Sequence, residues 1–313
     1  MPRTSQWGLA VGSMPYWFFA ILGAISLVIW WVPLTASLAL ALRNEQYTHL
    51  LLIVPITAAL IFVNWKTPEH SSGFSVALGS VLLVVAVIAR SETALLRPDA
   101  RLSLNMIALV VWWNTSFVIC FGAQAFRKAL FPLCFLLWLV PFPDFFMNPI
   151  ITLLQRGSAA SAHLLFAAVR VPVAQRAMFL HIPGLTLEVA PECSSIRSSL
   201  MLIVTTMVLA QVLLRSPWRK VLVITVAIPL SIAKNGLRIF TLGMLATRVD
   251  PSFLTGRLHR QGGIIFFSVA LAAIIFFLWI LRHGEDQNSD LPRDASPRQK
   301  SAKAAHLADL PMS

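Results

Sequence analysis

The sequence predicts an all-α protein that crosses a membrane about eight times and carries a short β-hairpin outside the membrane. Of its 313 residues, 57% are hydrophobic and only 12% are charged, which is about half the charged fraction of a soluble domain. Mean hydropathy is +0.75, and several apolar runs are long enough to cross a bilayer. These observations exclude a soluble globular enzyme and divide the chain into membrane spans.

Charged or proline-rich turns separate the predicted spans. In order, the spans cover residues 17–42, 50–65, 74–89, 104–122, 130–140, 196–214, 221–245 and 262–281. Pro33 interrupts the first span, and Pro141 and Pro143 end the fifth, because proline breaks helices. We predict one integral membrane domain over residues 1–281 and a polar, disordered cytoplasmic tail over residues 282–313.

Basic residues in the short loops predict the orientation of these spans. The turn 215–220 and the turn at Arg127 and Lys128 contain basic residues and no acid, so both are expected in the cytoplasm. With eight spans, both termini are then cytoplasmic. The mixed-charge loop 90–101 and the long segment 144–192 fall on the outer face.

The long outer segment contains two different patterns. Apolar residues recur at helical spacing over residues 150–169, with polar residues between them, which predicts an amphipathic helix at the membrane interface. Two β-like runs, 177–182 and 185–189, flank the turn at Pro183 and Gly184. This second pattern predicts a β-hairpin.

The net charge of +12 comes from basic residues scattered over short loops and the tail. That scatter suits anionic lipid head groups and topology, and it argues against a nucleic-acid partner. Cys120 and Cys134 lie inside apolar runs, whereas Cys193 does not. No disulfide framework, metal-ligand spacing or cofactor motif is visible, so we expect neither a metal nor a cofactor.

The segment 187–199 is unusually rich in reactive groups for a sequence that opens a membrane span. Cys193 is a candidate nucleophile, because a cysteine with basic neighbours forms the attacking thiolate more readily. The residues beside it are candidate supporting or substrate-proximal groups, namely Glu192, Ser194, Ser195 and Arg197. The structural alternative is that the serines cap a helix and the cysteine fills space.

Two more candidates fall on the same predicted face of the membrane. Arg238 lies near the outer end of the seventh span, and His259 lies in the outer loop before the eighth. Arginine inside a span is a functional candidate by default, although snorkelling towards the interface is its ordinary alternative. Asn235 is a supporting candidate, and Lys234 on the same face equally suits a lipid-head-group site. A cysteine, a histidine and an arginine together suggest acyl transfer.

These residues resemble a known family. The blocks Val189-Ala-Pro-Glu-Cys-Ser-Ser-Ile-Arg-Ser198 and Asn235-Gly-Leu-Arg-Ile239, then His259 and Gly262 before an apolar span, resemble in order and spacing the signature blocks of the exosortase/archaeosortase family. Glu45-Gln-Tyr-Thr-His49, entering the second span, also resembles the family. The resemblance extends from about residue 47 to residue 281. Ser195 departs from it, because the family usually has glycine there.

The resemblance implies a multi-pass cysteine protease or transpeptidase of the bacterial inner membrane, with its active site facing the periplasm. Its implied partners are exported proteins with a C-terminal sorting signal of the Pro-Glu-Pro type, followed by a transmembrane helix and a basic cluster. A lipid or glycan is the implied acceptor of the new carboxyl end. By the same resemblance, Cys193 is the nucleophile, Arg238 the family's arginine and His259 the third catalytic residue.

Two other functions remain compatible with the sequence. The polar residues Lys234, Asn235 and Arg238 also suit a transporter or export-channel subunit for an anionic lipid-linked or polysaccharide substrate, although the spans show no internal duplication. A membrane acyltransferase is less well supported, because its usual histidine-rich constellation is missing from the sequence.

Overall fold

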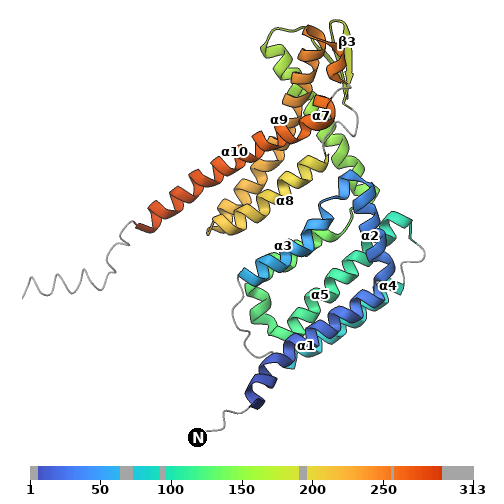
Figure 1. Ribbon diagram of the computed structural model, residues 1–313, viewed down its shortest axis with the longest axis vertical. Coiled ribbons are helices and arrows are strands. Elements are labelled where there is room, and N and C mark those ends of the chain that lie inside the picture. The colour runs from blue at the N-terminus through green and yellow to red at the C-terminus, as the bar shows by residue number, and fades with distance from the viewer. Residues whose placement is uncertain (1–5, 64–72, 92–95, 190–195, 255–256, 291–313) are drawn as a thin grey trace, which may run out of the picture. The chain divides into compact units, whose positions relative to one another are not determined.

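The computed structural model describes residues 6–63, 73–91, 96–189, 196–254 and 257–290. The chain divides into two compact units, residues 1–201 and 202–313, and their boundary falls inside helix α8 (Ile196–Leu213). Figure 1 shows that the described part is almost entirely helical apart from one small sheet.

Unit 1 is built around helix α5 (Pro98–Lys128), which packs against α1 and α4. The other elements of this unit, besides the start of α8, are α1 (Gln6–Ile29), α2 (Trp31–Arg43), η1 (Glu45–Tyr47), α3 (Leu50–Val63), α4 (Gly73–Ser91), α6 (Leu130–Phe135), η3 (Leu136–Leu139), α7 (Asp144–Ala168), β1 (Ala174–Arg176), β2 (Phe179–Ile182) and β3 (Leu185–Glu188). Pro98 starts α5 at a position where the missing N–H costs nothing. Two indoles of α5 then bind α1, since Trp112 donates to the Leu22 carbonyl (3.0 Å) and Trp113 to the Ser26 hydroxyl (2.9 Å).

The prediction of a polytopic all-α membrane protein is confirmed at this level, but the number of eight spans is not. Within the described residues, five helices are long and apolar enough to cross a membrane, or up to seven if each of two bent pairs counts as one span. The two pairs are α1 with α2, bent by 76°, and α6–η3 with α7, bent by 93°.

The bend in the first predicted span lies at Trp30, just before Pro33. Proline clashes with the carbonyl four residues earlier, which is that of Ile29, so the helix breaks there and α2 starts anew with Pro33 in its first turn. Trp30 is completely buried and lies against Trp112, with 5.5 Å between the ring centroids. The break is therefore a fixed part of the packing.

Helix α5 has a kink at Gly122, whose backbone angles are φ 84° and ψ 164°. Only glycine adopts this combination without strain. The helix nevertheless resumes and ends at Lys128, beyond the predicted end of the fourth span at residue 122.

The segment after Pro143, which the sequence predicts to lie outside the membrane, contains the helix and the hairpin expected from its two patterns. Helix α7 covers Asp144–Ala168 and is followed by a three-stranded antiparallel sheet in the order β1-β2-β3. Strands β2 and β3 form the predicted hairpin, with Leu180 opposite Leu187 and with Gly184 at φ 81° in the turn. The sheet's extra strand, β1, pairs with β2.

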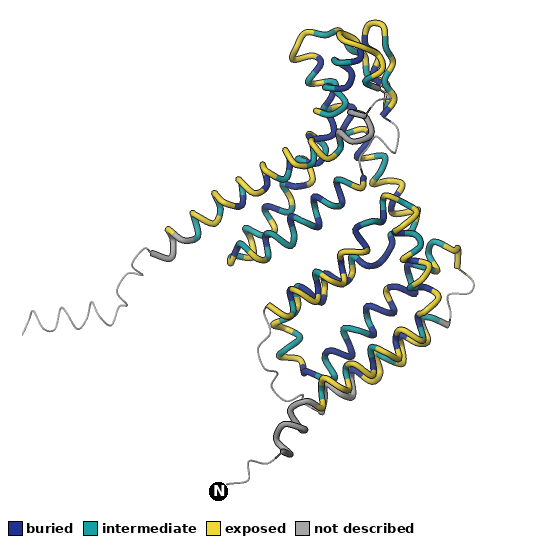
Figure 2. The backbone as a smooth tube through the Cα atoms, in the orientation of Figure 1, coloured by how far each residue is buried: buried dark blue, intermediate teal, exposed yellow. Residues whose placement is uncertain are grey.

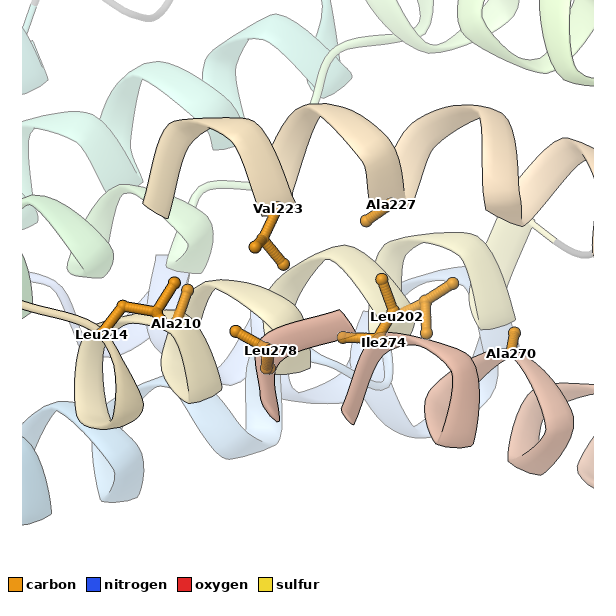
Figure 3. Packing of buried hydrophobic residues seen from close by; sticks show 8 residues of the cluster. All are labelled: Leu202, Ala210, Leu214, Val223, Ala227, Ala270, Ile274 and Leu278. Atoms are coloured by element: carbon orange, nitrogen blue, oxygen red, sulfur yellow. The ribbon is translucent and has the colours of Figure 1, made fainter. Parts of the chain in front are cut away.

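Unit 2 contains the rest of α8, then α9 (Pro217–Arg248), η5 (Pro251–Leu254) and α10 (Arg257–Asp290). Their core is a cluster of small and branched apolar side chains drawn from all three helices (Figure 3), namely Leu202, Ala210, Leu214, Val223, Ala227, Ala270, Ile274 and Leu278. Helix α10 continues beyond the predicted end of the last span at residue 281 and ends at Asp290.

The end of α10 holds the turn between α8 and α9. The Glu285 carboxylate accepts hydrogen bonds from the backbone N–H groups of Arg215 (2.9 Å) and Ser216 (2.8 Å). In return, the Arg219 guanidinium donates to the carbonyls of Leu281 and Gly284. These four hydrogen bonds fix the basic turn against the end of α10.

Large apolar side chains cover the helices on the outside. Figure 2 shows exposed residues along the faces of α1 and α10, where Trp17 is 70% exposed and Phe276 is 62% exposed. Such surfaces are unfavourable in water and stable in lipid. They support the assignment of the chain to a membrane.

Candidate active site

The predicted nucleophile lies outside the described residues, but both sides of its segment are described. Residues 190–195 are the gap, and they include Glu192, Cys193, Ser194 and Ser195. The chain enters this gap at Val189, directly after β3, and leaves it at Ile196, the first residue of α8. The contacts made by these two flanks are the described contacts nearest in sequence to the cysteine.

The entering flank is held by a buried side chain from α7. The Gln155 amide donates a hydrogen bond of 2.9 Å to the Val189 carbonyl, and the Val189 N–H donates to the Met178 carbonyl (2.9 Å). Gln155 is 4% exposed and Val189 is 1% exposed. Because a buried amide that loses its partner is costly, this contact fixes the end of the hairpin on α7.

The leaving flank is held by an ion pair. A guanidinium N–H of Arg197, in the first turn of α8, lies 3.0 Å from a carboxylate oxygen of Glu45 in η1. The two side chains are 50% and 82% exposed, so the pair is worth little for stability. Its value is geometric, since it links the start of α8 to a segment far away in the sequence.

η1 is itself fixed by neutral hydrogen bonds. The Asn44 side chain accepts from the Gln46 N–H (3.0 Å), and the Tyr47 hydroxyl donates to the Phe142 carbonyl (3.3 Å). His49 is buried and lies edge-on to Trp138, with 6.4 Å between the ring centroids. Glu45 therefore projects from a well-packed base.

A polar cavity of about 430 Å³ adjoins η1. It lies among η1, the start of α5, the Pro141-Phe142 link and the start of α7, and its polar lining residues are Asn44, Gln46, Tyr47, Asp99, Ser103, Asp144 and Asn148. Hydrogen bonds join these segments: Ser103 donates to the Pro141 carbonyl (2.6 Å), and the Asp144 N–H donates to Asp99 (3.2 Å). The links before η1, before α5 and before α7 thus meet at one end of unit 1.

Arg238 belongs to unit 2 and lies within α9, one helical turn after Lys234. Positions four residues apart share a helix face, so both cations are on one side of α9. Lys234 is 6% exposed, Asn235 is 1% exposed and Arg238 is half-buried. Two neighbouring cations repel each other, which makes this face suited to an anion or a developing negative charge.

His259 is helical, and the expectation that it lies in a loop is wrong. Helix α10 starts at Arg257, so the backbone of His259 lies in its first turn, and its side chain lies outside the described residues. In the turn before α10, the Asp250 carboxylate accepts a hydrogen bond from the Ser252 N–H (2.7 Å). Hydrogen bonding to Ser252 lowers the pKa of Asp250. Helices α9 and α10 pack side by side.

The structure thus pairs Arg197 with Glu45 and puts Asn235 and the half-buried Arg238 within one turn of α9. The meeting of Cys193, Arg238 and His259 stays a prediction. Sequence reasoning missed Gln155 and Glu45 as partners of the cysteine segment. The available signal was a glutamine on the apolar face of a helix, since buried polar groups need a defined partner.

The comparisons with known proteins agree with the membrane architecture. The model of the family described as transmembrane exosortase matches residues 30–276. The matched range contains Cys193, Arg238 and His259, and also both flanks of the cysteine segment. No curated protein and no solved structure matches the chain. Because the match covers well over half of the sequence, the chain belongs to the transmembrane exosortase family.

Proposed function

We propose that this exosortase is a membrane cysteine protease or transpeptidase that cleaves the C-terminal sorting signal of exported proteins at the outer face of the bacterial inner membrane. The observation that carries the proposal is the family match over residues 30–276, because exosortases act on exported proteins with such signals. The signal we expect is of the Pro-Glu-Pro type, with a transmembrane helix and a basic cluster after it.

In the proposed reaction, the Cys193 thiolate attacks the carbonyl carbon of the scissile peptide bond. The oxyanion of the tetrahedral intermediate is stabilised by the Arg238 guanidinium. The C–N bond then breaks, and the amine leaves with a proton from His259, which acted as ion-pair partner to the thiolate. A thioester remains on Cys193.

The second half of the reaction regenerates the enzyme. A nucleophile, either water or a group on a lipid or glycan acceptor, attacks the thioester and gives its proton to His259. The Cys193 thiolate is then released. Asn235 and Lys234, which share the stretch of α9 that carries Arg238, are proposed to orient the guanidinium and to add positive potential near the oxyanion.

The length of α9 supports the proposed depth of Arg238. The helix has 32 residues, whereas about 20 residues cross the hydrocarbon core. If the basic residues Arg219 and Lys220 mark one membrane surface, a stretch of that length ends close to Arg238. The arginine would then lie at the opposite interface, where a peptide reaching out of the bilayer is accessible.

The test is processing of a reporter in cells that express the full chain. The reporter is an exported protein that ends in a Pro-Glu-Pro motif, an apolar helix and a basic cluster. Wild type should shorten it, whereas Cys193→Ala should leave it intact while the enzyme stays in the membrane. Processing by Cys193→Ala at the wild-type rate would overturn the assignment. Solute transport that survives Cys193→Ser would favour a transporter.

A further inference from the structure

We propose that Gln155 and Glu45 are positioning residues that clamp the cysteine segment from its two sides. The inference rests on the proposed function for the role of Cys193. It concerns Gln155 and Glu45, to which the family resemblance gives no role, although Glu45 stands in a block that resembles the family. It starts from the two flank contacts described above, which come from elements far apart in the sequence, α7 and η1.

Chain length limits how far the nucleophile is from these contacts. Cys193 lies four residues after Val189 and four residues before Arg197. Four residues of chain span only a short distance, so each flank contact acts close to the cysteine along the chain. Movement of either flank therefore moves the thiol relative to its substrate.

The clamp on the entering side is the stronger one. Gln155 is the buried donor to the Val189 carbonyl, and the Val189 N–H is already used by Met178. With both backbone groups of Val189 bonded, the end of β3 has one position on α7. An apolar side chain at position 155 would leave the Val189 carbonyl buried without its donor.

The clamp on the leaving side acts through charge. Glu45 lies beside Asn44 and Gln46, which line the polar cavity, and Tyr47 fastens the same short helix to Phe142. The carboxylate thus binds the Arg197 guanidinium from a fixed base. Because the pair is exposed, both charges can be exchanged without burying a charge.

A positioning role has a different kinetic signature from a binding role. Neither clamp is expected to touch the substrate, so loss of a clamp should lower kcat and leave KM unchanged. A displacement of about 1 Å at a reacting atom costs up to about 100-fold in rate. The reactivity of the Cys193 thiol should change together with kcat.

The experiment compares variants of the full chain in which Cys120 and Cys134 are replaced by alanine. We expect Gln155→Leu to lower kcat for the sorting-signal reporter by about 10- to 100-fold with KM within about twofold. Glu45→Arg and Arg197→Glu should each lower kcat by about 10-fold, and their combination should recover most of it, because the ion pair re-forms with reversed sign.

Two controls make each outcome decisive. Thr152→Ala removes a hydroxyl whose hydrogen bond, among the residues that the structure describes, goes to the Asn148 carbonyl of its own helix, and should leave kcat unchanged. The rate of Cys193 labelling by an impermeant maleimide should shift in the single variants and return in the charge-exchanged pair. Wild-type kcat and labelling in Gln155→Leu and Glu45→Arg would overturn the clamp, whereas processing by Cys193→Ala would overturn the proposed function itself.

Discussion

At the scale of single residues, Arg238 is costly to place in a membrane span and well suited to stabilise an anion. It shares one face of α9 with Lys234, and the two cations are one turn apart. A cation inside a membrane span is expensive, and a second one beside it adds repulsion. The arrangement is reasonable if the pair faces an anionic group during the reaction. The proposal gives Arg238 that role towards the oxyanion.

Arg238→Lys tests the geometry of this role separately from its charge. Lysine keeps the positive charge and loses the planar fork of the guanidinium. We expect processing of the reporter to slow by about 100-fold or more, which is the usual cost of one oxyanion donor. Initial rates of cleavage in membranes measure it. A rate equal to wild type would make Arg238 a snorkelling cation.

At the scale of elements, the kink in α5 depends on the backbone freedom of one residue. Gly122 is buried and its φ is 84°. We expect Gly122→Ala to lower the free energy of unfolding by about 1–3 kcal/mol, because the side chain strains that conformation. Thermal unfolding in detergent measures the loss.

Gly23→Ala is the matched control for this substitution. Gly23 lies inside helix α1, and a Cβ added there meets nothing within 4 Å. Alanine is favoured over glycine in a helix, so its melting temperature should equal or slightly exceed that of wild type. Equal melting temperatures for wild type and Gly122→Ala would show that the kink is not strained by a side chain.

The contact between α10 and the α8–α9 turn gives a second prediction at this scale. Glu285 accepts two backbone N–H groups of the turn, and hydrogen bonds to charged groups are worth about 1.5–3 kcal/mol each. Because Glu285 is only partly shielded from solvent, we expect Glu285→Ala to cost about 1–2 kcal/mol. Thermal unfolding measures the loss, and Gln287→Ala, an exposed neighbour in α10, should leave the melting temperature unchanged.

Local patterns predicted many of the elements, and tertiary contacts explain the rest. The sequence predicts the turn at Pro183 and Gly184 and the helix end at Pro141, because glycine and proline act directly on the backbone. The position of the bend at Trp30 depends on a clash one turn before Pro33 and on packing against Trp112. Hydropathy places His259 in a loop because α10 starts with polar residues, which a search for apolar spans does not detect.

The contacts on the two sides of the cysteine segment could not be predicted from local sequence patterns either. Gln155 and Glu45 could be singled out only as polar residues beside apolar runs. Their partners lie far away in the sequence, and only the packing of α7 on the sheet and of η1 beside α8 identifies them.

At the scale of the whole molecule, the proposed function requires a defined orientation in the membrane. The basic turn 215–220 is predicted to be cytoplasmic, whereas the sheet β1–β3 is predicted outside. In a chain lacking Cys120, Cys134 and Cys193, a single cysteine introduced as Thr186→Cys in β3, which is exposed, should react with impermeant maleimide in intact spheroplasts. A cysteine introduced as Trp218→Cys, also exposed, should react only after lysis. The reverse pattern would invert the topology and remove the outward-facing active site.

The most direct measurement of the central claim is the mass of the enzyme during turnover. Purified full chain is mixed with a reporter ending in the sorting signal, quenched at low pH and digested for mass spectrometry. The proposed mechanism predicts an adduct on Cys193 that has the mass of the reporter's N-terminal fragment in thioester linkage. Neutral hydroxylamine should release this adduct, and Cys193→Ala should lack it. Reporter cleavage with no such adduct, or an adduct that persists in Cys193→Ala, would contradict it.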